Sequence, residues 1–93
     1  MCPYMDSTQE TLKKETEKWL AKLEKERPSL KIVSGMKEIP RVIKNMDAYI
    51  KDTRHFMEKG DFVRAFEAVI YAWGIMETLE HARLVERKSQ DKA

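Results

Sequence analysis

The chain has 93 residues, which is enough for one small domain, because domains usually contain about 100–200 residues. Its 18 Lys and Arg residues nearly balance 16 Asp and Glu residues, for a formal net charge of +2. Charge alone therefore indicates neither nucleic acid nor an anionic membrane as a partner. The 42% hydrophobic content suffices for one core, whereas three glycines and three prolines are too few for a loop-rich β fold.

The cysteine and histidine counts limit the chemistry of the chain. One cysteine excludes an internal disulfide and a Cys-rich zinc site, and two histidines argue against a His-based metal site. Residues 1–6 contain no apolar run of a signal peptide, and the longest apolar run, residues 68–76, is shorter than the roughly 20 residues of a membrane span. We expect a cytoplasmic protein with no membrane partner and with Cys2 as an idle thiol.

The first predicted helix covers about residues 8–27. Ser7 and Glu10 have the spacing of a capping box, in which each side chain bonds the backbone N–H of the other residue. Pro28 disfavours helical geometry at Arg27, so the helix should end there. A narrow apolar stripe at helical spacing contains Leu12, Thr16, Trp19, Leu20 and Leu23.

Residues 28–35 connect the first two helices and are unusually apolar. Leu30, Ile32 and Val33 should therefore fold over one end of the core. A short strand in this connection would have no partner to pair with, and isolated strand pairs have marginal stability.

The second predicted helix covers about residues 39–59 and carries the most regular pattern. Its seam advances in steps of three and four through Met36, Ile39, Ile43, Met46, Ile50, Thr53 and Met57. A flanking row of Val42, Tyr49 and Phe56 widens this apolar face. Pro40 suits the first turn of a helix and not its interior, so the helix should begin near Ile39.

The turn after the second helix has a clear signature. Gly60 should end that helix with a positive φ, because glycine adopts this conformation without steric cost. Asp61 should cap the next helix by accepting from the backbone N–H of Val63 or Arg64. A connection this short predicts an antiparallel hairpin.

The third predicted helix covers about residues 61–87 and has two apolar stripes. The first contains Phe62, Ala65, Phe66, Val69, Trp73 and Met76, and the second contains Ala68, Ala72, Ile75 and Leu79. Two stripes indicate two neighbouring helices. Charged residues continue the first stripe after Met76, so the core should end there and the last helical turns should project into solvent.

Together these patterns predict an all-α fold, a small antiparallel three-helix bundle with the third helix at its centre. The bundle should form one domain over residues 8–87, with flexible tails at residues 1–7 and 88–93. The side chains expected to be nearly fully buried are Trp19, Ile43, Ile50, Phe66, Val69 and Trp73.

No catalytic or cofactor-binding motif is present. The chain lacks the glycine-rich phosphate loops and the zinc-binding His-Glu-x-x-His pattern. Glu77, Glu80 and His81 fall within about one helical turn, but carboxylates in this position are usually only solvated. We therefore predict a non-enzymatic protein with no catalytic residue, cofactor or metal.

Two surfaces are candidates for binding. A line of basic residues on the second helix could follow phosphates or an acidic partner, and we call it the basic ridge: Lys37, Arg41, Lys44, Lys51 and His55. Asp47, Asp52 and Glu58 dilute its charge, and no aromatic side chain interleaves to stack a base. A solvated helix face is the simpler interpretation of this ridge.

The second candidate surface involves the third helix. Its outer face contains Arg64, Glu67, Tyr71, Gly74 and Thr78. A glycine inside a helix costs about 1 kcal/mol relative to alanine, so Gly74 beside Tyr71 could mark a close approach of another chain. The residues proposed for an interface are Tyr49, Phe56, Tyr71 and Gly74. The alternative is a tolerated glycine with a surface tyrosine.

The segment from Phe56 to Gly74, FMEKGDFVRAFEAVIYAWG, resembles a small archaeal family of helical proteins, the domain-of-unknown-function family three hundred and fifty-seven. Members of that family have a Glu/Lys-rich first helix, here residues 15–20, and a helical hairpin that turns at Lys-Gly-Asp. The resemblance covers most of residues 10–80 and implies a helical fold. It implies no activity, because the family has none assigned.

Two other groups share a Gly-Asp-aromatic turn. Tetratricopeptide proteins repeat their hairpin, whereas this chain has one. The nuclease branch of the nucleotide-binding helical domains of higher eukaryotes and prokaryotes carries an Arg followed a few residues later by His on its last helix. Here His81 precedes Arg83, so RNA cleavage is not implied.

Two functions remain in competition. The first is a non-catalytic helical module that binds a protein partner, with a homodimer through the open side of the second and third helices as the favoured form. The second is a nucleotide- or RNA-associated helical domain without nuclease residues. In the monomeric alternative, the apolar connection at residues 28–35 covers the surplus apolar surface instead.

Overall fold

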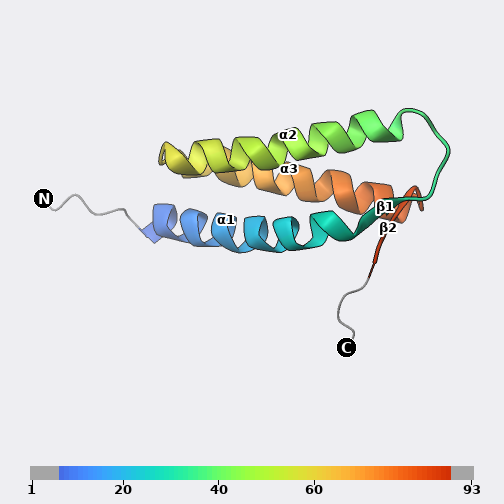
Figure 1. The fold of residues 1–93 in the computed structure, drawn as a ribbon. Helices are drawn as coiled ribbons and strands as arrows, with labels where there is room; N and C mark the ends of the chain where they lie inside the picture. The colour runs from blue at the N-terminus through green and yellow to red at the C-terminus, as the bar shows by residue number, and fades with distance from the viewer. Residues whose placement is uncertain (1–6, 89–93) are drawn as a thin grey trace, which may run out of the picture.

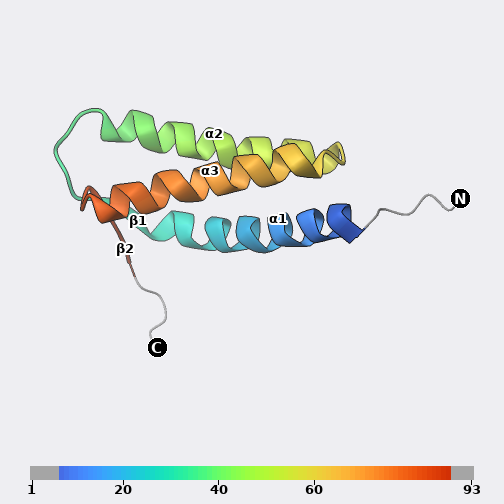
Figure 2. The same cartoon turned by 180° about the vertical axis from the view of Figure 1, so that it is seen from behind.

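The computed structural model describes residues 7–88. Along the chain lie α1 (Ser7–Glu26), one 3-10 turn (Arg27–Ser29), β1 (Leu30–Ile32), α2 (Ile39–Glu58), α3 (Phe62–His81) and β2 (Val85–Arg87). Figure 1 shows the helices side by side with α3 between α1 and α2, and the view from behind in Figure 2 agrees. The predicted all-α bundle is confirmed. Residues 1–6 and 89–93, predicted as tails, lie outside the described residues, and so does Cys2.

The hairpin turn follows the sequence closely. Gly60 has φ of +75°, and the backbone N–H groups of Gly60 and Asp61 donate to the carbonyls of Met57 and Phe56 at 3.1 and 2.9 Å. This pattern of bonds is the Schellman motif, which satisfies the last carbonyls of a helix. The Asp61 carboxylate then accepts from the backbone N–H of Arg64 at 3.1 Å, as predicted for an N-cap.

The centre of the bundle is α3. It packs extensively against both other helices, whereas α1 and α2 contact each other much less. Alanines at its buried positions allow the close approach of its neighbours. The buried residues of α3 are Ala65, Ala68, Val69, Ala72, Met76 and Leu79.

The core differs from the prediction in its largest side chains. Ile43, Ile50 and Val69 are buried, but Trp19, Phe66 and Trp73 are only half-buried. The closely packed helices leave room in the centre for Leu and Met side chains, and the two indoles lie along the groove between α1 and α3. There the Trp73 Nε1–H donates to the backbone carbonyl of Trp19 at 3.0 Å, and the rings meet edge to face at 5.6 Å.

The predicted continuation of the third helix to residue 87 is wrong. The helix ends at His81, and Arg83 adopts φ of 62°. The backbone N–H groups of Arg83 and Leu84 donate to the carbonyls of Glu80 and Leu79 at 2.9 Å each. This is a second Schellman motif, with arginine where glycine is usual.

The chain then returns toward the bundle rather than projecting into solvent. Strand β2 pairs antiparallel with β1, with Ile32 opposite Val85. A strand in the connection therefore does have a partner, contrary to the prediction. Val85 is 2% exposed and joins the core beside Leu79, so the core does not end at Met76. Among residues 7–88 no helix is long and apolar enough to cross a membrane.

Candidate functional site

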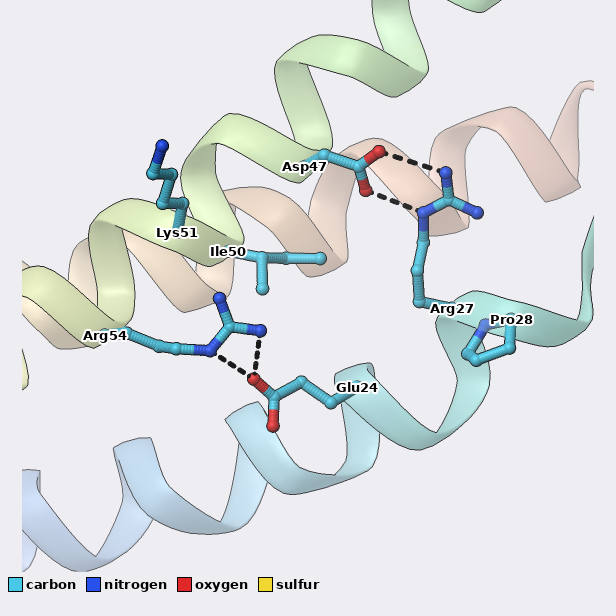
Figure 3. Close-up of a pocket in the computed structure, with 7 residues that line it drawn as sticks. All are labelled: Glu24, Arg27, Pro28, Asp47, Ile50, Lys51 and Arg54. Atoms are coloured by element: carbon cyan, nitrogen blue, oxygen red, sulfur yellow. Dashed lines mark hydrogen bonds and ion pairs between the residues drawn. The ribbon is translucent and has the colours of Figure 1, made fainter.

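A surface hollow lies between α1, the turn after it and α2 (Figure 3). Its volume is about 560 Å³. Two ion pairs bridge it. Arg27 donates through Nε and Nη2 to the two carboxylate oxygens of Asp47 at 2.6 and 3.0 Å, and Arg54 donates through Nε to Glu24 at 2.6 Å. The lining residues are Glu24, Arg27, Pro28, Asp47, Ile50, Lys51 and Arg54.

The ion pairs decide what this hollow can do. The hydrogen bond to Asp47 raises the pKa of Arg27 above its already high ordinary value. Both guanidinium groups already hold a carboxylate, so an anionic ligand would have to displace one. The two ion pairs therefore link α1 and the turn after it to α2, a helix that α1 otherwise contacts little.

The basic ridge runs along the exposed side of α2. Lys37 lies just before the helix, and Arg41, Lys44, Lys51 and His55 lie on it. All five side chains are exposed, and within residues 7–88 none of them forms an ion pair. Among the described residues, the aromatic ring that meets a ridge side chain is that of Phe56, whose centroid lies 5.4 Å from that of His55. The ridge thus exists as a charged surface without an aromatic platform.

The four residues predicted for an interface are brought together along the groove between α2 and α3. Tyr49 and Phe56 line its first part, of about 310 Å³, together with Tyr71. Tyr71 and Gly74 line its second part, of about 370 Å³. Tyr71 joins the two parts, and its ring meets that of Tyr49 edge to face at 4.6 Å. The sequence-based grouping of these residues therefore corresponds to one surface.

Gly74 occupies a special place on this surface. It also lines a smaller groove of about 230 Å³ on the other side of α3, beside Trp19 and Trp73. A Cβ atom at Gly74 would meet no heavy atom within 4 Å apart from its chain neighbours and the adjacent backbone of its own helix. Packing within the described chain therefore does not require a glycine here, although the glycine weakens the helix.

Two exposed apolar residues of α3 outside the groove between α2 and α3 were missed by the sequence reasoning. Val63 is 55% exposed and Ile70 is 42% exposed, next to Tyr71 at 57%. Their spacing of seven residues, with Gly74 four residues further, could have revealed a shared face. We define the α3 outer face as Val63, Ile70, Tyr71 and Gly74 with the exposed polar residues Glu67 and His81.

The apolar connection does not cover the α3 outer face. The grooves on either side of Gly74 are lined by residues of α1, α2 and α3 alone. Leu30 packs against the core, whereas Ile32 and Val33 remain exposed near the paired strands. In the monomeric alternative, residues 28–35 were expected to cover the surplus apolar surface. Within residues 7–88 they do not cover the α3 outer face.

The acidic cluster near the end of α3 is divided by its contacts. Glu80 pairs with Arg87 of β2, whose guanidinium also reaches Glu26 at 3.6 Å. Within residues 7–88 no three His, Cys, Asp or Glu side chains are grouped to hold a metal ion.

Comparison with known proteins agrees with the fold and the resemblance. The crystal structure of protein AF1782 from Archaeoglobus fulgidus is similar, with 36% sequence identity and a TM-score of 0.76, covering 87% of this chain and 99% of that chain. No curated protein matches. Residues 14–85 match the family described as "Protein of unknown function (DUF357)". The chain therefore belongs to the DUF357 family.

Proposed function

We propose that the chain is a non-catalytic, cytoplasmic helical module that binds a protein partner through the α3 outer face. The observation that carries the proposal is Gly74, an interior helix residue that faces open space beside the exposed Tyr71. Glycine at position 74 weakens the helix, and packing within the described residues does not require it. The close approach of another chain at this position would explain why a glycine is present.

The surroundings of Gly74 support this proposal. Val63, Ile70 and Tyr71 are all more than two-fifths exposed, and monomeric proteins rarely expose contiguous apolar patches larger than a few hundred Å². Tyrosine is enriched at protein interfaces. The contact with Tyr49 restrains the Tyr71 ring before binding, which lowers the conformational entropy lost when a partner docks.

Site-specific photocrosslinking tests the proposal. The photoreactive residue p-benzoyl-phenylalanine replaces Tyr71 in the full chain, and in a matched control it replaces the exposed Lys14 of α1. The proposal predicts a discrete protein adduct, either with the chain itself or with a protein from the source organism, at position 71 and not at position 14. Equal labelling at the two positions would contradict it.

A second candidate function, association with RNA, is favoured by one observation. The five residues of the basic ridge carry no ion pair within residues 7–88, whereas Arg27, Arg54, Arg64 and Arg87 are all paired. Phosphate contacts weaken steeply with salt. Binding of a generic RNA that falls with salt and with Lys44→Gln/Lys51→Gln would support this function, and absence of binding at low salt would exclude it.

A further inference from the structure

We infer that the partner of the α3 outer face is a second copy of the chain, packed antiparallel about a two-fold axis at Gly74. This inference rests on the proposed function, because it names the partner that the face would bind. Two-fold homodimers are the commonest protein assemblies, and their interface uses the same surface on both copies.

The exposed side of α3 has the spacing of a helix-pairing seam. Steps of four and three residues connect Val63, Glu67, Ile70, Gly74, Glu77 and His81, all of them exposed. This is the spacing of the positions through which one helix packs along another, here with Val63 and Ile70 as its large apolar members. The buried residues of α3 lie on its other sides, so this seam is available to a further helix.

The polar residues of the seam have no partner within the described chain. Within residues 7–88, the side chains of Glu67, Glu77 and His81 form no hydrogen bond or ion pair. Their neighbour Arg64 is already held by Asp61 at 3.1 Å. The seam therefore offers a partner the free carboxylates of Glu67 and Glu77 as hydrogen-bond acceptors and the free imidazole N–H of His81 as a donor.

A two-fold axis at Gly74 makes these groups complementary. In an antiparallel pair, a residue a given number of positions before Gly74 meets the residue the same number of positions after it on the other copy. Glu67 then meets His81, Tyr71 meets Glu77, and Ile70 meets Thr78, each twice. The Glu67 carboxylate thus faces the imidazole N–H of His81, and the Glu77 carboxylate faces the phenol O–H of Tyr71. Both the imidazole and the phenol can donate a hydrogen bond to the carboxylate opposite.

A parallel pair lacks this complementarity. It would place Glu67 against Glu67 and Glu77 against Glu77, and juxtaposed like charges oppose association. The antiparallel pair also puts the two glycines at the crossing point, where the absence of side chains allows the closest approach of the helices. Hydrogen-bond complementarity, the avoidance of carboxylate pairs and the position of Gly74 therefore favour the same antiparallel arrangement.

Charge reversal tests this arrangement in the full chain. Sedimentation equilibrium measures the dimer dissociation constant of the parent, of Glu67→Lys, of His81→Glu and of the double variant. His81→Glu places two carboxylates opposite each other at each of two contacts, and Glu67→Lys replaces the acceptor of the imidazole N–H with a cation, so each single change should raise the dissociation constant about tenfold or more. The double variant again sets a carboxylate opposite a donor, with the two roles exchanged between positions 67 and 81, and should return within about threefold of the parent.

Matched controls separate this effect from general changes of charge. Glu17→Lys on α1 and His55→Glu on α2 make the same substitutions at exposed positions away from the seam, and both should leave the dissociation constant unchanged. Circular dichroism checks that every variant keeps its helical content. Recovery in the double variant also excludes unfolding as the cause of the single-variant losses.

The outcomes distinguish the inference from the proposed function. A monomer at every concentration, with Tyr71 crosslinked to a different protein, would overturn the inference and leave the proposed function standing. A monomer with no specific crosslink would overturn both. The antiparallel arrangement would be overturned if the chain forms a dimer whose dissociation constant is unchanged in both single variants. It would also be overturned if the double variant does not return the dissociation constant to near that of the parent.

Discussion

Replacing Gly74 by alanine should stabilise the isolated chain. The residue lies inside α3, where alanine is favoured over glycine by about 0.8–1.0 kcal/mol. Apart from its chain neighbours and the adjacent helix backbone, the new methyl group meets no heavy atom within 4 Å, so no steric cost offsets this gain. The free energy of unfolding should rise by about 1 kcal/mol, and the melting temperature by about 4–8 °C for a domain of this size.

Urea unfolding followed by tryptophan fluorescence measures this change, because Trp19 and Trp73 contact each other only in the folded bundle. The fluorescence signal allows concentrations low enough to keep the chain monomeric. Gly60→Ala provides the matched control, since φ at Gly60 is +75° and a left-handed conformation costs a residue with a Cβ about 1–2 kcal/mol. The two substitutions should shift stability in opposite directions. A loss of stability in Gly74→Ala at low concentration would refute the claim that Gly74 faces open space.

Three further substitutions test the packing of the helices. Trp73→Ala should lower the free energy of unfolding by about 3 kcal/mol, because it removes the hydrogen bond and ring contact to Trp19; a melting temperature within a few degrees of the parent would argue against the central role of α3. Thr53→Val should change stability in urea by less than about 1 kcal/mol, because the buried hydroxyl bonds only to a backbone carbonyl one turn earlier, and a larger loss would refute this. Asp47→Asn should cost about 0.5–1 kcal/mol at low salt and less at high salt, because its pair with Arg27 is partly exposed; equal costs at both salt concentrations would contradict a screened ion pair.

The helices and the hairpin could be predicted from the sequence because their signals are local. The proline at position 40, the glycine at position 60 and the aspartate at position 61 set element ends through their own backbone and capping chemistry. The end of α3 lacks such a signal, since Arg83 takes the left-handed position normally filled by glycine. Pairing of β1 with β2 depends on that turn and joins segments far apart in the sequence, so periodicity could not show it.

The candidate surface could be predicted only in part. Helical spacing identified Tyr71 and Gly74, and the hairpin geometry brought Tyr49 and Phe56 to the same groove. Ile70 was missed because it lies within an apolar run, where only its spacing to Val63 and Gly74 distinguishes it from the buried residues. Its exposure depends on where α1 packs against α3, and this tertiary contact is not visible in helical periodicity.

The same dependence on packing explains the half-buried tryptophans. Trp19 and Trp73 lie on the apolar stripes that the sequence defines, but the alanines of α3 bring the helices too close together for indoles in the centre. Side-chain size and spacing between helices together decide which stripe residues are fully enclosed. Position on an apolar stripe therefore predicted which side of each helix faces the core. It did not predict what fraction of each side chain is buried there.

The central claim is that the α3 outer face pairs with a second copy of the chain. Sedimentation equilibrium of the unchanged chain across the micromolar range tests it most directly. The claim predicts a mass that rises with concentration toward twice the 11.0 kDa of one chain. A single species near 11.0 kDa, unchanged as the protein is concentrated, would contradict it.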